Sequence, residues 1–178
     1  MISAPSGCGK TTIVKRLLER NQNLARSISY TTRPPRSGEV DGRDYFFISA
    51  KEFSSKERNG FFLESATFFD QSYGTSKEFV MDRLSHGLYV VLAIDVQGMK
   101  QLRAKVGPEI PTTSIFIMPP SVHALKARLE KRKTETAAEI EERLKIAKKE
   151  MAAKSLYDFV VVNQKVDQAV KTIEGIVK

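Results

Sequence analysis

The sequence predicts an α/β protein built on a doubly wound parallel sheet, and three observations support this. A loop of small residues follows a short apolar stretch and precedes an amphipathic helix. Continuously apolar stretches, which are typical of parallel strands covered on both faces, recur later and alternate with helical patterns. The alternation is interrupted at residues 29–79, where β-type patterns dominate. This interruption predicts that residues 29–79 form an insertion between elements of the main sheet.

The loop has the sequence Ala4-Pro5-Ser6-Gly7-Cys8-Gly9-Lys10-Thr11, which resembles a phosphate-binding loop. Its glycines allow successive backbone N–H groups to turn toward one phosphate. We expect Lys10 to reach the β- and γ-phosphates of a nucleotide and the Thr11 hydroxyl to bind Mg²⁺. The pattern normally has glycine at position 4, so Ala4 fits only if its φ stays negative. The alternative is an ordinary turn that caps a helix.

The elements of the first half follow from local patterns. Two prolines after Arg33 predict a rigid extended loop that also carries Arg36. Ser49 and Glu52 have the spacing of a capping box. The predicted elements are a short strand at 1–3, a helix at 10–20, a strand at 45–48, a helix from Ser49 to about Arg58, a strand at 61–69 and a helix at 76–86 that ends at Gly87. The first strand is short for a central one, so either it is stubby or the natural chain begins upstream.

The second half alternates regularly between strands and helices. Ser121 is expected to cap one helix, and Thr136 with Glu139 makes a second capping box that begins a long helix. The apolar residues of this long helix recur at helical spacing. Buried strands are predicted at 88–94, 113–118 and 156–162, with helices following each of them, the last at 166–177.

Composition limits the class of protein. The chain has 178 residues, which fits either one domain or one compact core with inserted subdomains. No apolar run approaches the roughly 18 residues that span a bilayer, and no signal-peptide pattern is found, so a cytoplasmic location is expected. The single cysteine, Cys8, excludes an intramolecular disulfide. A formal net charge of +8 suits a polyanionic ligand, the alternatives being nonspecific nucleic-acid affinity or simple solubility.

A second motif makes the interpretation more specific. The segment Thr31-Thr32-Arg33-x-x-Arg36-x-x-Glu39-x-x-Gly42-x-x-Tyr45-x-Phe47-Ile48 resembles the signature of the guanylate kinases at every constrained position. The similarity continues through Glu64, Tyr73-Gly74-Thr75, Ile94-Asp95-x-Gln97-Gly98 and three later arginines, and so spans nearly the whole chain.

This resemblance implies a P-loop NTPase fold with an inserted β-rich GMP-binding subdomain at 29–79 and a helical lid at 130–150. The core would then comprise 1–28, 80–129 and 151–178. The implied reaction, in purine nucleotide metabolism, is the Mg²⁺-dependent transfer of the γ-phosphoryl group of ATP to GMP, and to dGMP. No residue can be assigned to the 2′-hydroxyl, so the preference between GMP and dGMP stays open. The implied partners are these small molecules, with no nucleic acid and no membrane.

The resemblance also assigns site residues. ATP would be bound by Ala4, Pro5, Ser6, Gly7, Cys8, Gly9, Lys10, Thr11 and Thr12, with Thr11 as the metal ligand. GMP would be bound by Ser29, Arg33, Arg36, Tyr45, Glu64, Tyr73, Gly74, Thr75 and Asp95. The catalytic residues would be Lys10, Arg36, Arg128, Arg132 and Arg143. Such a site is rich in arginine and tyrosine because the attacking phosphate oxygen is already anionic and needs no strong base. His86 and His123 are therefore given no catalytic role.

Some positions leave alternatives open. Ala93 stands where many family members have aspartate, which could weaken Mg²⁺ positioning or leave it to water and Thr11. Lys133 replaces a common lid glycine and could stiffen the hinge or add a phosphate contact. Arg143 could instead be a helix-surface partner of Glu139.

Three alternatives compete with guanylate kinase activity. Guanylate-kinase-like modules of scaffolding proteins bind phosphopeptides without catalysis, but they typically lose the loop lysine and much of the lid arginine set, which this chain keeps. A kinase of another phosphate, such as a sugar phosphate, is disfavoured by the combination of Glu64, Thr75 and Asp95. A nucleic-acid-binding protein is disfavoured because no stacking platform or recognition helix is evident.

Overall fold

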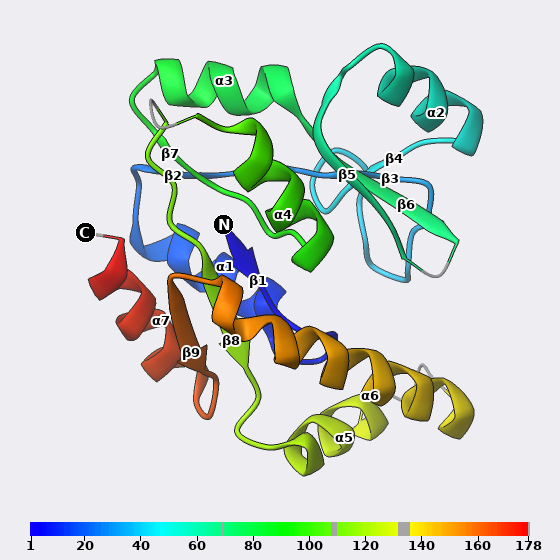
Figure 1. Cartoon of the computed structure of the whole chain (residues 1–178), viewed down its shortest axis with the longest axis vertical. Helices are drawn as coiled ribbons and strands as arrows, with labels where there is room; N and C mark the ends of the chain where they lie inside the picture. Colours follow the sequence, from blue (N-terminus) through cyan, green and yellow to red (C-terminus); the bar gives the residue numbers. More distant parts are fainter. Residues whose placement is uncertain (69, 108–109, 132–135, 178) are drawn as a thin grey trace. The chain divides into compact units, whose positions relative to one another are not determined.

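A computed structural model describes the chain except for residues 69, 108–109, 132–135 and 178 (Figure 1). The chain divides into two compact units. The first comprises 1–21, 93–96 and 111–178, and the second comprises 22–92 and 97–110. This division follows contacts within the chain. The three parts expected from substrate binding, at 29–79, at 130–150 and in the remaining core, stay a prediction.

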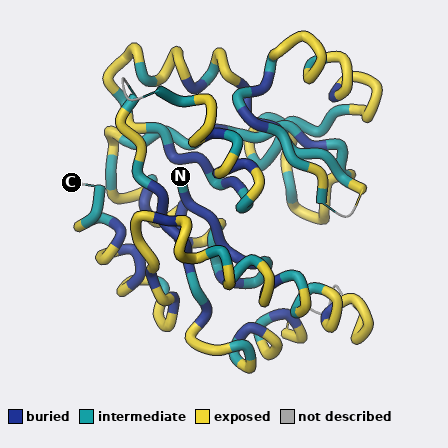
Figure 2. Tube along the Cα trace, in the orientation of Figure 1, coloured by how far each residue is buried: buried dark blue, intermediate teal, exposed yellow. Residues whose placement is uncertain are grey.

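The first unit contains a parallel sheet in the order β1-β8-β9. Its strands are β1 (Ile2–Ser3), β8 (Ile115–Met118) and β9 (Phe159–Val162). The middle strand β8 is buried along Ile115–Ile117, and Figure 2 shows the buried residues running along β1 and β8. An isolated parallel bridge also joins Ile2 to Ala93. Two amphipathic helices pack together in this unit, α1 (Lys10–Arg20) and α7 (Val166–Ile176).

The remaining helices of the first unit begin where side chains cap them. Ser121 Oγ accepts a hydrogen bond from the Ala124 N–H at 3.0 Å, at the start of α5 (Val122–Lys131). Thr136 and Glu139 form both bonds of the capping box that begins α6 (Ala137–Ala152), as the sequence predicts. A short 3₁₀ helix (Ala153–Leu156) follows α6. Among the described residues, no helix is both long and apolar enough to cross a membrane.

The second unit contains two sheets. Strands β2 (Leu24–Arg26) and β7 (Tyr89–Val91) pair in parallel, and the other sheet is mixed, in the order β4-β3-β6-β5. The strands of this mixed sheet are β3 (Tyr30–Thr31), β4 (Phe46–Phe47), β5 (Phe62–Phe68) and β6 (Gln71–Ser76). Its helix α2 (Ala50–Arg58) begins at Ser49, whose side chain accepts from the Glu52 N–H. The helices α3 (Lys77–Ser85) and α4 (Val96–Lys105) flank β7 in sequence.

Aromatic rings hold the mixed sheet together. Phe53 of α2 stacks on Phe62 of β5 with ring centroids 4.6 Å apart, and Tyr30 stacks on Phe46 at 4.7 Å. A Cβ atom on Gly74 would lie 2.8 Å from the Phe62 ring, so only glycine leaves room for this ring at that position of β6.

Two of the predicted strands are more exposed than expected. The stretch at 156–162 was predicted to be a buried strand, but Phe159, Val160 and Val162 are exposed because β9 is an edge strand with β8 as its sheet neighbour. At 88–94 the described strand is only β7, and its first residue Tyr89 is 63% exposed. The polar strand β6 was not predicted, because its residues show no apolar alternation.

The contrast between β8 and β9 predicts different costs for removing the same side chain. Phe116→Ala removes a completely buried ring and should lower the free energy of unfolding by about 3–5 kcal/mol. Phe159→Ala, on the neighbouring strand but 44% exposed, is the control and should cost about 1 kcal/mol or less. Urea unfolding of both variants measures this difference. Equal losses would mean that β9 is covered in solution.

Candidate functional site

The loop at 4–9 connects β1 to α1 in the first unit. Gly7 has φ of 89° and Gly9 has φ of 85°, both in the left-handed region that favours glycine. Among the described residues other than glycine, only Asp70 has a positive φ, so the φ of Ala4 is negative. This confirms the backbone condition that the sequence sets for alanine at this position. Because α1 begins at Lys10, the helix N-terminus adds a favourable dipole for a bound phosphate.

The loop lysine has a defined neighbour. Lys10 Nζ donates a hydrogen bond to the Ile94 carbonyl at 3.2 Å, in the segment that follows Ala93. Thr11 and Thr12 are exposed on the first turn of α1, whereas Cys8 is completely buried. The buried thiol of Cys8 therefore fills space inside the loop. The exposed hydroxyls are accessible to a nucleotide.

Two of the three arginines that the resemblance calls catalytic in the second half of the chain make defined contacts. Arg143 of α6 donates from Nη1 to Ser6 Oγ at 3.1 Å, and Arg128 of α5 donates from Nη2 to the Asn163 carbonyl at 2.9 Å. Glu139 meanwhile accepts from Thr136 in the capping box. The contact with Ser6 favours a phosphate-site role for Arg143 over that of a helix-surface partner. Arg132 and Lys133 lie outside the described residues.

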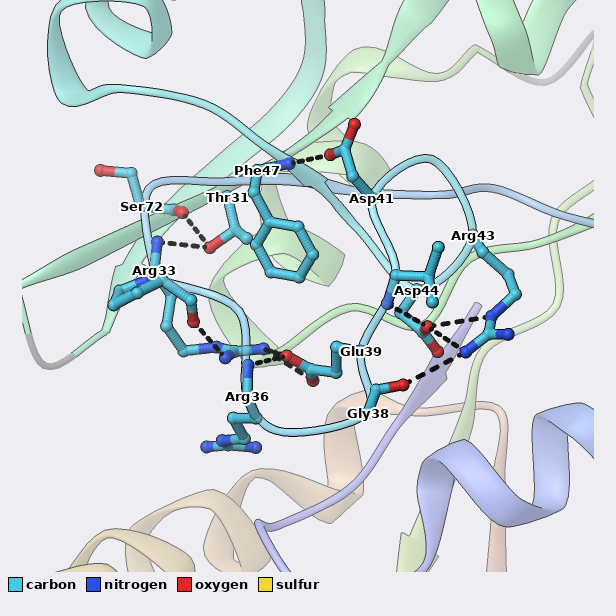
Figure 3. A network of polar contacts seen from close by, with 12 residues as sticks. Thr31, Arg33, Arg36, Gly38, Glu39, Asp41, Arg43, Asp44, Phe47 and Ser72 are labelled. Carbon is cyan, nitrogen blue, oxygen red and sulfur yellow. Dashed lines mark hydrogen bonds and ion pairs between the residues drawn. The ribbon is translucent and has the colours of Figure 1, made fainter.

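In the second unit, Arg33 is paired with Glu39 (Figure 3). Its Nη2 lies 2.9 Å from both carboxylate oxygens, and its guanidinium carbon lies 5.4 Å from the centre of the Tyr45 ring. Burial alone would lower the pKa of Arg33, but the hydrogen bonds and charge of Glu39 outweigh it and raise this pKa above its ordinary value. Glu39 also accepts from the Arg36 N–H at 2.7 Å, so one carboxylate orders the whole loop.

Next to this pair lie groups that can donate hydrogen bonds to an anion. The rings of Tyr45 and Tyr73 meet edge-on with centroids 6.1 Å apart. Burial raises the pKa of Tyr45, which keeps its phenol protonated as a donor. The Arg36 guanidinium is exposed and has no hydrogen bond or ion pair within the described residues (Figure 3). Ser29 precedes β3, and its carbonyl accepts from the Phe46 N–H at 3.0 Å.

Glu64 and Thr75 lie opposite each other in the pairing of β5 with β6. Thr75 Oγ1 donates to Glu64 Oε1 at 2.5 Å, and the two residues are only 1% and 4% exposed, respectively. Glu64 is therefore not the outward-facing strand residue that a solvated sheet would have. Asp95 belongs to the first unit, where its carbonyl accepts from Ser3 Oγ at 3.4 Å.

Three contributions were not found by sequence reasoning. Glu39 belongs to the matched signature, but its pairing with Arg33 was not predicted. Asn163 is buried against the phosphate loop and donates to the Cys8 carbonyl at 2.7 Å. Glu150 of α6 is partly buried, and burial raises the pKa of its carboxyl to about 7 against the attraction of Lys10. The sequence does carry a signal for Glu150. It follows Arg143 by two helical turns, so both residues lie on the same face of α6.

Comparison with known proteins shows which family the chain resembles. The family described as guanylate kinase matches the chain over residues 1–178. The chain is 47% identical over 176 residues to a guanylate kinase of Wolbachia sp. subsp. Brugia malayi, covering 99% of this chain and 89% of the relative. It is 48% identical over 177 residues to that of Caldanaerobacter subterraneus subsp. tengcongensis, covering 99% and 84%.

Solved structures give the same picture for the fold. The crystal structure of guanylate kinase from Anaplasma phagocytophilum is similar with a TM-score of 0.78 and 34% identity, covering 99% of this chain and 81% of that one. Shikimate kinase from Bacteroides thetaiotaomicron matches with a TM-score of 0.51 at 13% identity, over 99% of this chain and 95% of that one. This second likeness concerns the fold alone.

The raised pKa of Glu150 predicts a pH-dependent stability. The Glu150 carboxyl holds its proton more tightly in the folded state than in the unfolded chain, where its pKa is near 4.5. Protonated Glu150 therefore stabilises the fold fully below about pH 4.5, and this contribution to the free energy of unfolding is lost as the pH rises through about 7. Glu150→Gln has no carboxyl to titrate at this position. The melting temperature of the variant minus that of the wild type should therefore increase from pH 5 to pH 8. Glu141→Gln changes an exposed carboxyl of the same helix and is the control. A difference between Glu150→Gln and wild type that stays constant with pH would contradict the prediction.

Proposed function

The chain belongs to the guanylate kinase family, and we propose that it transfers the γ-phosphoryl group of ATP to GMP through the residues described above. The observation that carries the assignment of the acceptor is the buried pair of Glu64 and Thr75. A carboxylate buried inside a sheet depends on hydrogen-bond donors within the site, so a ligand that offers it two donors side by side is strongly preferred.

The ATP side of the reaction rests on the phosphate loop. Its backbone N–H groups and the start of α1 bind the phosphates, and Lys10 neutralises the β- and γ-oxygens. Arg128 and Arg143, with Arg132 by resemblance, supply guanidinium charge to the phosphoryl group in transfer. The contact of Arg143 with Ser6 supports this role, because it brings a cation to the loop before any ligand binds.

The metal expected for this reaction fits the loop only together with the nucleotide. Among the described residues, no group of three His, Cys, Asp or Glu side chains is arranged to hold a metal ion. Mg²⁺ commonly takes few protein ligands and several phosphate oxygens, which matches a site supplied by the Thr11 hydroxyl and ATP. When bound, it would neutralise part of the phosphate charge.

GMP would bind in the second unit. The Arg36 guanidinium and the phenols of Tyr45 and Tyr73 would donate to its phosphate, together with the Ser29 hydroxyl. Arg33 would act in a fixed orientation, because Glu39 holds its guanidinium by two hydrogen bonds. Glu39 also cancels much of the charge of Arg33. Arg36 would therefore supply most of the net charge that attracts the phosphate.

Recognition of the base would depend on hydrogen-bond donors. Guanine presents N1–H and N2–H₂ side by side, which a carboxylate such as Glu64 can accept in bidentate fashion. Asp95 would assist, and the Thr75 hydroxyl, which donates its one hydrogen to Glu64 in this structure, would turn to donate it to O6 once guanine occupies the carboxylate, with Gly74 beside it in β6. Adenine lacks this pair of donors and would leave Glu64 unsatisfied. Since none of these contacts involves the 2′-hydroxyl, dGMP would also be an acceptor.

The parts of the chain would move during the reaction. Residues 29–79 would act as the GMP-binding subdomain and residues 130–150 as a lid that excludes water when both substrates are bound. Exclusion of water would limit wasteful hydrolysis of ATP. A kinase of free nucleotides fits the cytoplasm, where both substrates are found.

An assay of ADP release tests the proposed function. With ATP and Mg²⁺ the protein should turn over with GMP and dGMP, and much more slowly with AMP, UMP or no acceptor. Lys10→Ala should lower kcat at least about 100-fold, because it removes a cation from the transferring group. Lys15→Ala removes an exposed lysine from the same helix and should keep the wild-type rate. Absence of turnover with every acceptor would reject the kinase, and equal rates with AMP would reject the guanine site.

The assignment of Glu64 predicts a selective loss. Glu64→Ala should raise the KM for GMP about 10- to 100-fold, as expected for hydrogen bonds to a charged group, and leave the KM for ATP nearly unchanged. Glu57→Ala is the matched control. This exposed carboxylate accepts a hydrogen bond from Ser65 Oγ at 2.6 Å, and Ser65 is the residue after Glu64 in β5. Steady-state kinetics with each substrate varied in turn give both constants. Equal changes in the two KM values would remove Glu64 from the guanine site.

A further inference from the structure

Asn163 is a buried polar residue that the proposed reaction does not yet use. It directly follows β9, and its side chain and backbone are only 2% exposed. Its backbone N–H donates to the Met118 carbonyl at 2.8 Å, which continues the pairing of β9 with β8 by one residue. The sheet therefore fixes the position of this residue independently of its side chain.

The side chain of Asn163 contacts the phosphate loop. Its Nδ2 donates to the Cys8 carbonyl at 2.7 Å, inside the protein. A Cβ atom on Gly9 would lie 2.7 Å from the same nitrogen, so the amide packs directly against this glycine. Asn163 Oδ1 is buried and has no hydrogen-bond partner within the described residues. The bond to Cys8 is thus what orients the amide.

This contact matters because of the peptide group between Cys8 and Gly9. The peptide is planar and trans, so its C=O and N–H point in opposite directions. Glycine at position 9 tolerates both signs of φ, and the peptide could flip at little steric cost. When Asn163 holds the Cys8 carbonyl, the Gly9 N–H must point away from Asn163, and a flip would break a buried hydrogen bond.

The backbone of Asn163 contacts a second part of the site. Its carbonyl accepts from Arg128 Nη2 at 2.9 Å. A neutral carbonyl orients the guanidinium without cancelling its charge. One residue therefore fixes both the loop that binds phosphates and an arginine proposed to act on the transferring phosphoryl group.

We propose that Asn163 is a positioning residue of the phosphoryl-transfer site, which holds the Cys8–Gly9 peptide in the orientation that presents the Gly9 N–H to the nucleotide phosphates. The side-chain amide performs this role, and the backbone carbonyl places Arg128 beside the same loop. The inference rests on the proposed function for its effect on catalysis, whereas its effect on the loop is independent of the acceptor.

The test compares Asn163→Asp and Asn163→Ala with the wild type. Aspartate keeps the shape of the side chain and replaces the donor by an acceptor, and alanine removes the amide without adding charge. Gln164→Glu is the matched control, because it makes the same change of charge at the next residue, which is exposed. Three quantities are measured for each protein: the melting temperature, the affinity for Mg²⁺·ADP by calorimetry, and kcat with the KM for GMP.

Both Asn163 variants should bind ADP about tenfold more weakly, as expected for a lost buried hydrogen bond that orders a phosphate ligand. Their kcat should fall about 10- to 100-fold with the KM for GMP within about threefold of wild type, since small misplacements of reacting groups have effects of this size. Gln164→Glu should match the wild type in all three measurements.

Other outcomes would overturn the proposal. ADP affinity and kcat within twofold of wild type in Asn163→Asp or Asn163→Ala would show that the amide does not position the loop. Losses as large in Gln164→Glu would assign the effect to charge, and losses explained by the unfolded fraction would assign it to stability. If alanine prevents folding, aspartate alone decides. A wild type that binds ADP but transfers no phosphoryl group would reject the proposed function, while the ADP affinities would still decide the role of Asn163.

Discussion

The conformation of the loop at 4–9 is the constraint on which the first unit depends. Gly7 and Gly9 both have left-handed φ values, and both are also crowded: a Cβ atom would meet Leu129 at 2.9 Å in one case and Asn163 at 2.7 Å in the other. The left-handed backbone therefore requires glycine at the two positions, and the close packing favours it further. The neighbours that impose this come from α5 and from the end of β9. The loop can keep its shape only while the sheet and these elements hold their places.

The cations of the structure are oriented in two different ways. Lys10, Arg128 and Arg143 each donate to a neutral oxygen, namely a backbone carbonyl or a serine hydroxyl. A bond to a neutral oxygen fixes the direction of the cation and does not itself cancel its charge. Arg33 is instead paired with the carboxylate of Glu39, which fixes it more strongly and cancels charge. The first arrangement suits stabilisation of a transition state, and the second suits a rigid binding loop.

Local signals in the sequence predicted most elements correctly. The helix at 10–20 has the bounds expected from its apolar stripe, and the capping residues Ser49 and Thr136 mark real helix starts. Burial of strands was predicted less well. A run such as that at 156–162 looks the same whether a strand is central or at an edge, because burial depends on how many neighbours the sheet provides. Likewise β6 exists through its pairing with β3 and β5, which no local pattern of its polar residues reveals.

The site shows the same division between local and distant causes. Spacing indicated the phosphate loop, and the resemblance to a recognised motif assigned Glu64 and Thr75 to one site, but their mutual hydrogen bond was not predicted. Asn163 acts on Cys8 across 155 residues, and an asparagine after an apolar strand is an ordinary way to end that strand. Its importance follows from the planarity of one peptide group, which transmits the direction of a carbonyl to the N–H on its other side. A motif specifies which residues bind the phosphate, whereas residues elsewhere in the chain decide how the backbone of that motif is oriented.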